Sequence, residues 1–298
     1  MGGEPLVSIM MPCFNAERTL PMALASLRTQ TYENWEALVV DDGSSDGTWD
    51  LLRAFGDPRL RLERFDRNEG RGVARQRCLE MAKGSLLAFL DADDWLFPGK
   101  LALQVDLMQE RPELVVVSGA CVITNALGDA VGLTRTGLKP GEDFSTGLFS
   151  YPHPPPLSFP PCMVRMSAAK HSGFNPEFRR SQDSDFLIRL MLGQRYAVSA
   201  EPVYAYSQAE AASLDKTLEG YRFRIRCYAR YTASYPLRSR MEIAKTLARM
   251  GVYEVAGWLG SEQRLIERRW QDITPEARAA YETAREEVMD SAETKVAS

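Results

Sequence analysis

Short apolar runs separated by helical patterns organise about the first 120 residues of the chain. Each run is rich in Val, Ile, Leu or Met and ends at polar or turn-forming residues, which is typical of a strand buried in a parallel sheet. The predicted strands are Val7–Met11, Ala37–Val40, Leu60–Glu63, Leu86–Leu90 and Leu114–Ser118. Between them, apolar residues recur at the three- and four-residue spacing of amphipathic helices. The predicted helices are Leu20–Leu27, Trp49–Phe55, Gly72–Ala82 and Leu101–Met108.

This alternation of strands and helices predicts the fold class. Consecutive βαβ units join through right-handed crossovers and give an open, mainly parallel α/β sheet with helices on both faces. Ligands of such sheets bind beyond the carboxyl ends of the strands. Three polar clusters follow apolar runs directly, at Pro12–Glu17, Asp41–Asp46 and Asp91–Asp94. Their shared edge predicts one composite site.

The rest of the chain changes character twice. Residues Leu133–Pro161 are dominated by Gly, Pro, Ser and Thr, and such a long irregular stretch predicts a substrate loop or lid. A helix is predicted from Gln182, and after about Ser213 only helical patterns follow. These are Tyr221–Ala233, Arg238–Met250, Val252–Leu259, Glu262–Trp270 and Pro275–Met289. We therefore expect a sheet domain of residues 1–215 and an all-helical C-terminal extension of residues 216–298.

Charge and cysteine usage narrow the class of protein. The formal net charge of the 298-residue chain is −4, so no basic field spans the sequence and nucleic acid is not expected as a partner. The five cysteines are scattered without a Cys-x-x-Cys pair, which favours reduced thiols in the cytoplasm over a zinc site or a disulfide framework. No apolar run approaches the roughly 20 residues of a membrane-spanning helix, so we expect a soluble protein or one that lies on a membrane.

Asp91, Asp93 and Asp94 follow a predicted strand with no basic residue among them. Crowding three carboxylates costs electrostatic repulsion, so a cation is expected beside them. Oxygen ligands suit Mg²⁺ or Mn²⁺, which typically take one or two carboxylates and complete their coordination with water and diphosphate oxygens. A solvated acidic turn is the alternative, because Asp is common in turns.

Three motifs, Val7–Glu17, Val39–Thr48 and Phe89–Asp94, occur in an order and at a spacing that resembles the family 2 glycosyltransferases of the GT-A fold. The resemblance covers about residues 6–215 and implies a Rossmann-like sheet that binds a nucleotide-diphosphate sugar, with a UDP-sugar favoured. It implies that the loop with Pro12, Phe14, Asn15 and Glu17 lies under the nucleoside. By the same resemblance, Asp42 lies near the base ring, Asp91 near the ribose, Arg75 near the diphosphate, and Asp93 is the metal ligand for Mn²⁺ or Mg²⁺.

The resemblance also implies a general base for the acceptor hydroxyl. Gly173–Phe178 precedes Gln182–Phe186, so Asp183 matches the catalytic base of the family, while Gln182 replaces the usual glutamate. Carboxylates are favoured in the first turn of a helix, and helix capping is the alternative role for Asp183 and Asp185. A single base in line with the leaving group implies inversion at the anomeric carbon.

The sequence departs from the family pattern at two places. Gln76 and Cys78 stand where relatives often carry Asn and Gly, which puts local donor contacts in doubt. Tyr206–Glu210 falls where many relatives carry Tyr-Arg-x-His, so the histidine that helps to hold metal or diphosphate is absent. Either metal affinity is reduced, or His153 approaches the metal from the Leu133–Pro161 loop.

The helical extension suggests partners. Arginines and aromatic residues interleave over residues 221–249, which predicts either contact with an anionic membrane and a lipid-linked or glycan acceptor, or a solvated helix face packed on the main domain. The acidic, amphipathic Pro275–Glu293 segment is either a contact in a homo-oligomer or a frayed end. Together these patterns predict a cytoplasmic protein, with peripheral association at the inner face of the membrane as one outcome.

The resulting hypothesis is an inverting, metal-dependent glycosyltransferase of surface-glycan or glycoconjugate synthesis. A sugar nucleotidyltransferase ranks below it, because no Gly-rich, Lys-bearing phosphate loop occurs near the N-terminus. A non-catalytic nucleotide-sugar binding module is the third reading, suggested by Gln182 and the missing histidine.

Overall fold

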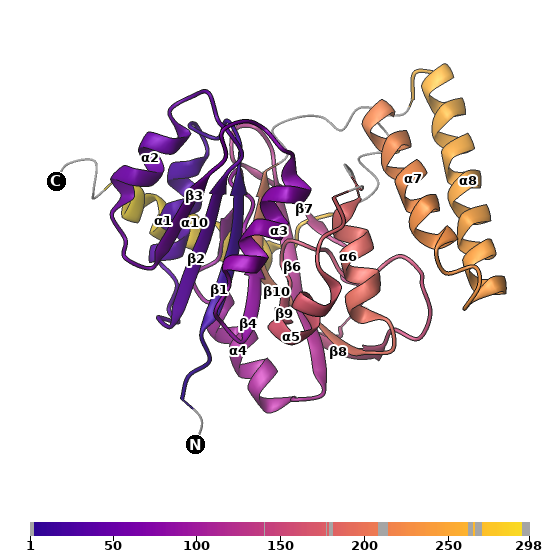
Figure 1. Ribbon diagram of the computed structural model, residues 1–298, viewed down its shortest axis with the longest axis horizontal. Coiled ribbons are helices and arrows are strands. Elements are labelled where there is room, and N and C mark those ends of the chain that lie inside the picture. Colours follow the sequence, from indigo (N-terminus) through magenta and orange to yellow (C-terminus); the bar gives the residue numbers. More distant parts are fainter. Residues whose placement is uncertain are drawn as a thin grey trace.

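An eleven-stranded sheet forms the centre of the computed structural model, which describes residues 3–139, 141–176, 178, 181–207, 214–261, 265 and 270–293 (Figure 1). The strands that carry the first half of the chain are β1 Val7–Cys13, β2 Trp35–Asp41, β3 Leu60–Arg64, β4 Leu86–Phe89, β5 Trp95–Leu96 and β6 Leu114–Thr124. The later strands are β7 Ala130–Thr134, β8 Phe144–Leu148, β9 Met163–Arg165, β10 Arg195–Ser207 and β11 Trp270–Gln271. The helices are α1 Leu20–Arg28, α2 Thr48–Phe55, α3 Arg71–Met81, α4 Lys100–Glu110, α5 Met166–Ser172, α6 Gln182–Met191, α7 Leu214–Ala229, α8 Pro236–Trp258 and α10 Pro275–Glu293.

Strands β4, β1, β2 and β3 lie side by side and are all parallel. Every residue of β1 and β2 is buried, because helices cover both faces of this half of the sheet. Successive residues of β1 therefore enter different cores: Ile9 packs in the cluster that contains α1, and Met10 packs in the cluster that contains α3. The predicted α/β sheet with helices on both faces is confirmed.

The other half of the sheet is mixed. The short strand β9 lies between β4 and β6 and is antiparallel to both. Because Met163 of β9 pairs with Ala88 of β4, the chain just before β9 runs past the carboxyl end of β4. This arrangement brings Phe159 against Phe89, with 4.2 Å between ring centroids. It also places residues 152–161, which we call the Pro-rich loop, beside the Asp91 turn.

The element boundaries differ from the expected ones at three places. Strand β8, Phe144–Leu148, lies inside the stretch expected to be irregular, and its exposed edge residues give no apolar run to detect. Helix α8 continues through Gly251, where two helices were expected, since a single glycine costs a helix only about 1 kcal/mol. The expected helix Glu262–Trp270 lies mostly outside the described residues, and Trp270 itself belongs to β11.

The C-terminal extension has two parts. Helices α7 and α8 pack against each other and project from the sheet at the right of Figure 1. Strand β11 and helix α10 return to the sheet, where β11 pairs with β7 and Tyr281 of α10 packs on Trp95. The extension is largely helical, as predicted, but it is not all-helical, because Trp270–Gln271 form a strand. The expected boundary near residue 215 stays a prediction. No helix within the described ranges is both long and apolar enough to span a bilayer.

Candidate active site

The loops after β1 and β2 are joined by hydrogen bonds. The Asn15 amide donates to Ser44 Oγ at 2.9 Å, and the Ser45 amide donates to Asn15 Oδ1 at 2.9 Å. Glu17 Oε2 accepts from the Gly47 amide at 3.1 Å. The two polar clusters therefore form one rim, as their positions after neighbouring strands predict. Asn15 adopts a positive φ of 49°, a conformation that Asn tolerates better than most residues.

Pro12 and Phe14 flank the last residue of β1. Pro12 is buried and opposite Val40 in the register, whereas 47% of Phe14 is exposed. An exposed aromatic ring at this rim is available to contact a planar ligand group. The structure thus keeps Pro12 in the sheet and presents Phe14 to solvent.

Asp42 connects this rim to helix α3. Its Oδ1 accepts from the Glu69 amide at 2.7 Å, and its Oδ2 accepts from the Gly70 amide at 2.9 Å. Burial raises the pKa of Asp42 above its usual value, although these two hydrogen bonds act in the opposite direction. Gly70 has a φ of 99°, which favours glycine at this turn. Asp42 therefore fixes the start of the helix that carries Arg71 and Arg75.

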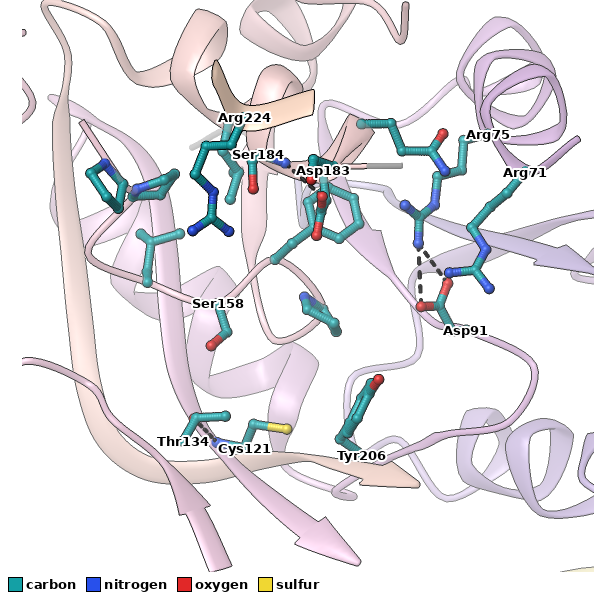
Figure 2. Close-up of a pocket in the computed structure, with 18 of the residues that line it drawn as sticks. Arg71, Arg75, Asp91, Cys121, Thr134, Ser158, Asp183, Ser184, Tyr206 and Arg224 are labelled. Atoms are coloured by element: carbon teal, nitrogen blue, oxygen red, sulfur yellow. Dashed lines mark hydrogen bonds and ion pairs between the residues drawn. The ribbon is translucent and has the colours of Figure 1, made fainter. Parts of the chain in front are cut away.

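Arg75 and Asp91 form a largely buried ion pair (Figure 2). Arg75 Nη2 donates to Asp91 Oδ1 at 2.8 Å and to Oδ2 at 3.2 Å, and the guanidinium carbon lies 4.8 Å from the Phe159 ring centroid. Burial alone would lower the pKa of Arg75, but the charges of Asp91 and Asp183 raise it. Burial alone would raise the pKa of Asp91, but Arg75 and Arg71 lower it. Both groups are therefore held in their charged forms.

The three acidic side chains of the turn have different surroundings. Tyr204 Oη accepts from the Asp91 amide at 3.0 Å and donates to Asp94 Oδ2 at 2.8 Å. The Ser207 amide donates to Asp94 Oδ1 at 2.7 Å, so the buried Asp94 carboxyl links the turn to β10. Burial and the charges of Asp93 and Asp91 raise the pKa of Asp94 well above its usual value. Desolvation and the charge of Asp91 raise the pKa of Asp93.

The carboxylates of this turn are suited to hold one metal cation. Asp91 is engaged by Arg75 and Asp94 by β10, while the Asp93 carboxylate has no hydrogen-bond or ion-pair partner among the described residues. No group of three or more His, Cys, Asp or Glu side chains converges to hold a metal within the described part of the chain. A Mg²⁺ or Mn²⁺ ion needs as few as one protein carboxylate when diphosphate and water fill its other positions. Burial and, after it, the charge of Asp91 raise the pKa of Asp93, and a bound cation would relieve the repulsion between these two carboxylates.

Asp183 lies on the same pocket as the Arg75–Asp91 pair (Figure 2). The pocket has a volume of about 780 Å³. Helix α6 begins at Gln182, after Ser181 at a φ of 53°, and this start places Asp183 on the pocket wall. The carboxylate accepts from the Ser184 amide at 2.8 Å and is half-buried. The lining residues are Arg71, Arg75, Asp91, Cys121, Ile123, Thr134, Pro154, Pro155, Leu157, Ser158, Phe159, Pro160, Ser181, Gln182, Asp183, Ser184, Leu187, Tyr206, Glu219, Arg224 and Trp270.

The structure therefore gathers the expected residues in two adjoining groups. Arg75, Asp91 and Asp183 line one pocket, and Asp93 lies two residues beyond Asp91 in the same turn. Pro12, Phe14, Asn15, Glu17 and Asp42 form the neighbouring rim outside this lining, joined to the pocket through α3. This arrangement offers one surface for an elongated anionic ligand.

Asp185 has a structural role. It is buried and pairs with Arg189 at 2.7 Å and with Arg230, the residue directly after α7, at 3.4 Å. The pairing ties α6 to the C-terminal helices. It also takes one arginine of the 221–249 stretch away from any external partner.

His153 has its contacts elsewhere. Its Nδ1 lies 2.8 Å from the Pro154 carbonyl oxygen, and its ring packs on Phe149 and Tyr151. Burial lowers its pKa, with smaller effects from Glu242 and Lys245 of α8. The contacts of His153 are with neighbours in its own segment, the charges that affect it come from α8, and none of these groups belongs to the Asp93 turn. The structure gives no support to His153 as a substitute metal ligand.

Three further residues contribute to the pocket through contacts that the sequence does not show. Tyr204 holds the acidic turn from 110 residues away in the chain, and Phe159 backs the Arg75 guanidinium. Gln182 is buried with its Oε1 unpaired among the described residues, and a Cβ added at Gly72 would lie 2.8 Å from it. Tertiary contacts alone reveal these roles, since each depends on residues far apart in sequence.

Comparison with known proteins agrees with this architecture. The sequence profile of Glycosyl transferase family 2 matches residues 8–172, and the chain belongs to this family. It is 44% identical over 103 residues to the Escherichia coli UDP-Glc:alpha-D-GlcNAc-diphosphoundecaprenol beta-1,3-glucosyltransferase WfgD, covering 35% of this chain and 41% of WfgD. It is 39% identical over 110 residues to the putative teichuronic acid biosynthesis glycosyltransferase TuaG of Bacillus subtilis strain 168, covering 36% of this chain and 44% of TuaG.

Solved structures share the fold over most of the chain. The structure of S. aureus TarS 1-349 in complex with UDP matches with a TM-score of 0.61 and 19% identity, covering 96% of this chain and 88% of the other. The mannosyltransferase PcManGT from Pyrobaculum calidifontis, in complex with GDP-Man and Mn²⁺, matches with a TM-score of 0.59 and 17% identity, covering 98% and 87%. The matched segments span less than half of WfgD and TuaG, and the family assignment rests on the profile match over residues 8–172.

Proposed function

We propose that the protein is an inverting glycosyltransferase that moves a sugar from a nucleotide-diphosphate donor to an acceptor hydroxyl in the synthesis of a cell-surface glycan. The observation that carries the proposal is the meeting of Asp183 with the Arg75–Asp91 pair on one pocket. Cationic and acidic groups in one pocket suit a reaction in which negative charge grows on a leaving diphosphate while a proton leaves the acceptor.

The rim formed by Pro12, Phe14, Asn15, Glu17 and Asp42 binds the nucleoside in this proposal. Phe14 is the exposed aromatic group of the rim, and Asp42 sets the position of the adjoining helix start. A UDP-sugar is the favoured donor, because the names of WfgD and of the TarS complex specify UDP-Glc and UDP. The GDP-Man complex of PcManGT makes a GDP-sugar the comparison to include in any donor screen.

Arg75 and Arg71 line the same pocket as Asp183 and face the leaving diphosphate in this assignment. Arg75 is fixed by Asp91 and Phe159, so its charge needs no rearrangement as the leaving group departs. Asp183 accepts the proton of the acceptor hydroxyl. One base on the face away from the leaving diphosphate gives inversion.

Asp93 is the residue that would hold Mn²⁺ or Mg²⁺ against the diphosphate. A bound metal would supply Lewis-acid stabilisation of the leaving diphosphate. The chain contributes one uncommitted carboxylate there, because the neighbouring Asp91 and Asp94 have protein partners.

A lipid-linked glycan is the favoured acceptor, since the name of WfgD specifies a diphosphoundecaprenol acceptor. The corresponding location is the cytoplasm, with peripheral contact at the inner face of the membrane. A homo-oligomer is compatible with the proposal, and α10 is not its expected interface because Tyr281 and Val288 are buried against the sheet.

The test is release of nucleoside diphosphate from a panel of UDP- and GDP-sugars with Mn²⁺, in the presence of a diphosphate-lipid acceptor. A transferase forms glycosylated acceptor and nucleoside diphosphate in equal amounts, and the anomeric configuration of the product reports inversion. Release of pyrophosphate from sugar phosphate and nucleoside triphosphate would identify a nucleotidyltransferase instead. Donor binding without turnover against any acceptor would identify a binding module.

A further inference from the structure

Helix α8 buries three polar residues beside Tyr253 and Ala256, and it leaves several large apolar residues exposed. Ser239, Glu242 and Thr246 are buried, and Lys245 pairs with Glu242 at 2.8 Å. Six large apolar side chains of α8 and its C-cap are exposed: Leu237, Leu247, Val252, Val255, Trp258 and Leu259. We call these six residues the outer α8 face. A helix on the surface of a soluble domain normally shows the reverse pattern.

The outer α8 face forms a stripe along one side of the helix, interrupted by the exposed Arg240. At about 100° per residue its six side chains fall within an arc of about 140°, and the 23-residue helix extends over about 34 Å. Leu237 at one end is 80% exposed, and Trp258 at the other end is 86% exposed. Exposed apolar surface of this kind marks a site of contact with a partner or a membrane.

The charges beside the stripe favour an anionic partner. Arg240 is exposed within the arc of the stripe, Lys245 and Arg249 are exposed beyond one edge of it, and Glu254 is exposed beyond the other edge. Basic side chains that flank an apolar face suit a bilayer with anionic lipids, where they reach the headgroups as the apolar residues enter the interface. Two copies of the same face would instead bring like charges together. A Trp at one end of the stripe also suits the boundary between headgroups and acyl chains.

We propose that the outer α8 face docks on the surface of an anionic lipid bilayer. Helix α7, which packs against α8, contributes Glu219 and Arg224 to the pocket, so docking would bring the α7 side of the pocket close to the lipid headgroups. The suggestion that the α7 side of the pocket receives a lipid-linked acceptor rests on the proposed function. The binding to lipid rests on the outer α8 face alone.

This surface differs from the basic stripe expected over residues 221–249. Arg230, directly after α7, pairs with Asp185, and Arg224 of α7 lines the pocket. Arg226 stacks on Phe223, with 5.3 Å from its guanidinium carbon to the ring centroid. The apolar residues of α8 therefore carry the docking, and the arginines of α7 serve mainly the contact between the helices and the pocket.

The test is co-sedimentation of the full chain with sucrose-loaded vesicles of phosphatidylcholine, with and without phosphatidylglycerol. We expect binding to the anionic vesicles and a loss of about tenfold or more in affinity for the double variant Val255→Ser with Trp258→Ser. Arg249→Glu should weaken binding to the anionic vesicles and leave any binding to neutral vesicles unchanged. Leu127→Ser is the matched control, because Leu127 is 79% exposed in the turn between β6 and β7. This variant should sediment like the unmodified chain.

Three results would overturn the proposed docking surface. The first is that the unmodified chain sediments with neither kind of vesicle, and the second is that Leu127→Ser loses as much vesicle affinity as the double variant. The third is that the unmodified chain is a dimer in light scattering while the Val255→Ser, Trp258→Ser variant is a monomer. Turnover of a short-chain acceptor in solution should be equal for this variant and the unmodified chain. Turnover without lipid binding would refute the docking alone, and lipid binding without turnover of any donor would refute the proposed function alone.

Discussion

The Arg75–Asp91 pair should be the main stabilising contact beneath the pocket. Arg75→Met keeps the length of the side chain and removes its charge, which leaves the Asp91 carboxylate beside an apolar side chain. Removing one partner of a buried ion pair typically costs about 3–5 kcal/mol of unfolding free energy. The Asp91 side chain is 21% exposed, so water offsets part of this cost and we expect a loss of about 2–4 kcal/mol.

Urea unfolding of the chain at neutral pH, followed by Trp fluorescence without donor or metal, measures this loss. Arg77→Met is the matched control, because Arg77 lies on the same helix and pairs with Glu63 at 2.7 Å, but its side chain is 42% exposed. An exposed pair of this kind contributes about 0–1 kcal/mol. The double variant Arg75→Met with Asp91→Asn should be less destabilised than the sum of the single variants, by about 0.5–3 kcal/mol.

The pH dependence gives an independent check. Arg75 and Arg71 lower the pKa of Asp91 in the folded chain despite its burial, so the pair stabilises the fold above the pKa of unfolded Asp, about 3.9. This stabilisation is lost as the pH falls through the lower folded-state pKa. The difference between the unmodified chain and Arg75→Met should therefore shrink below about pH 4. A cost under about 1 kcal/mol at neutral pH, or additivity in the double variant, would refute a buried, coupled pair.

Three other changes test separate parts of the molecule. Asp183→Asn should leave donor binding intact and lower turnover by about 10²–10⁴-fold, and a loss below tenfold in single-turnover assays would exclude Asp183 as the base. Asp93→Ala should abolish the Mn²⁺ dependence of donor binding measured by calorimetry, so an unchanged Mn²⁺ response would reject it as the ligand. Burial lowers the pKa of Lys100 to about 7, so the unfolded chain binds an extra proton between pH 7 and 10, and the unfolding free energy should rise with pH by up to about 1.4 kcal/mol per unit. Lys100→Met should flatten this rise in urea unfolding, and an unchanged slope would assign it to other groups.

Much of the candidate site could be predicted because local patterns encode it. Parallel strands deliver their carboxyl ends to one edge, so Asn15, Asp42 and Asp91 could be expected there from the runs that precede them. The separate roles of the three carboxylates in the acidic turn could not be predicted in the same detail. Asp91, Asp93 and Asp94 have the same chemistry in sequence, and only their partners in the fold separate an ion pair, an uncommitted carboxylate and a buried hydrogen-bonded carboxyl.

The apolar periodicity of the chain by itself determined the α/β sheet and most of its helices, because burial on both faces leaves a strong local signal. The tertiary structure alone decided that β9 enters the sheet antiparallel, which brings Phe159 and the Pro-rich loop to the Arg75–Asp91 pair. It also decided that α8 turns several large apolar residues outward. Both depend on contacts between segments far apart in sequence. Apolar periodicity shows which residues share one face of a helix, but it does not show whether that face points to the core or to solvent.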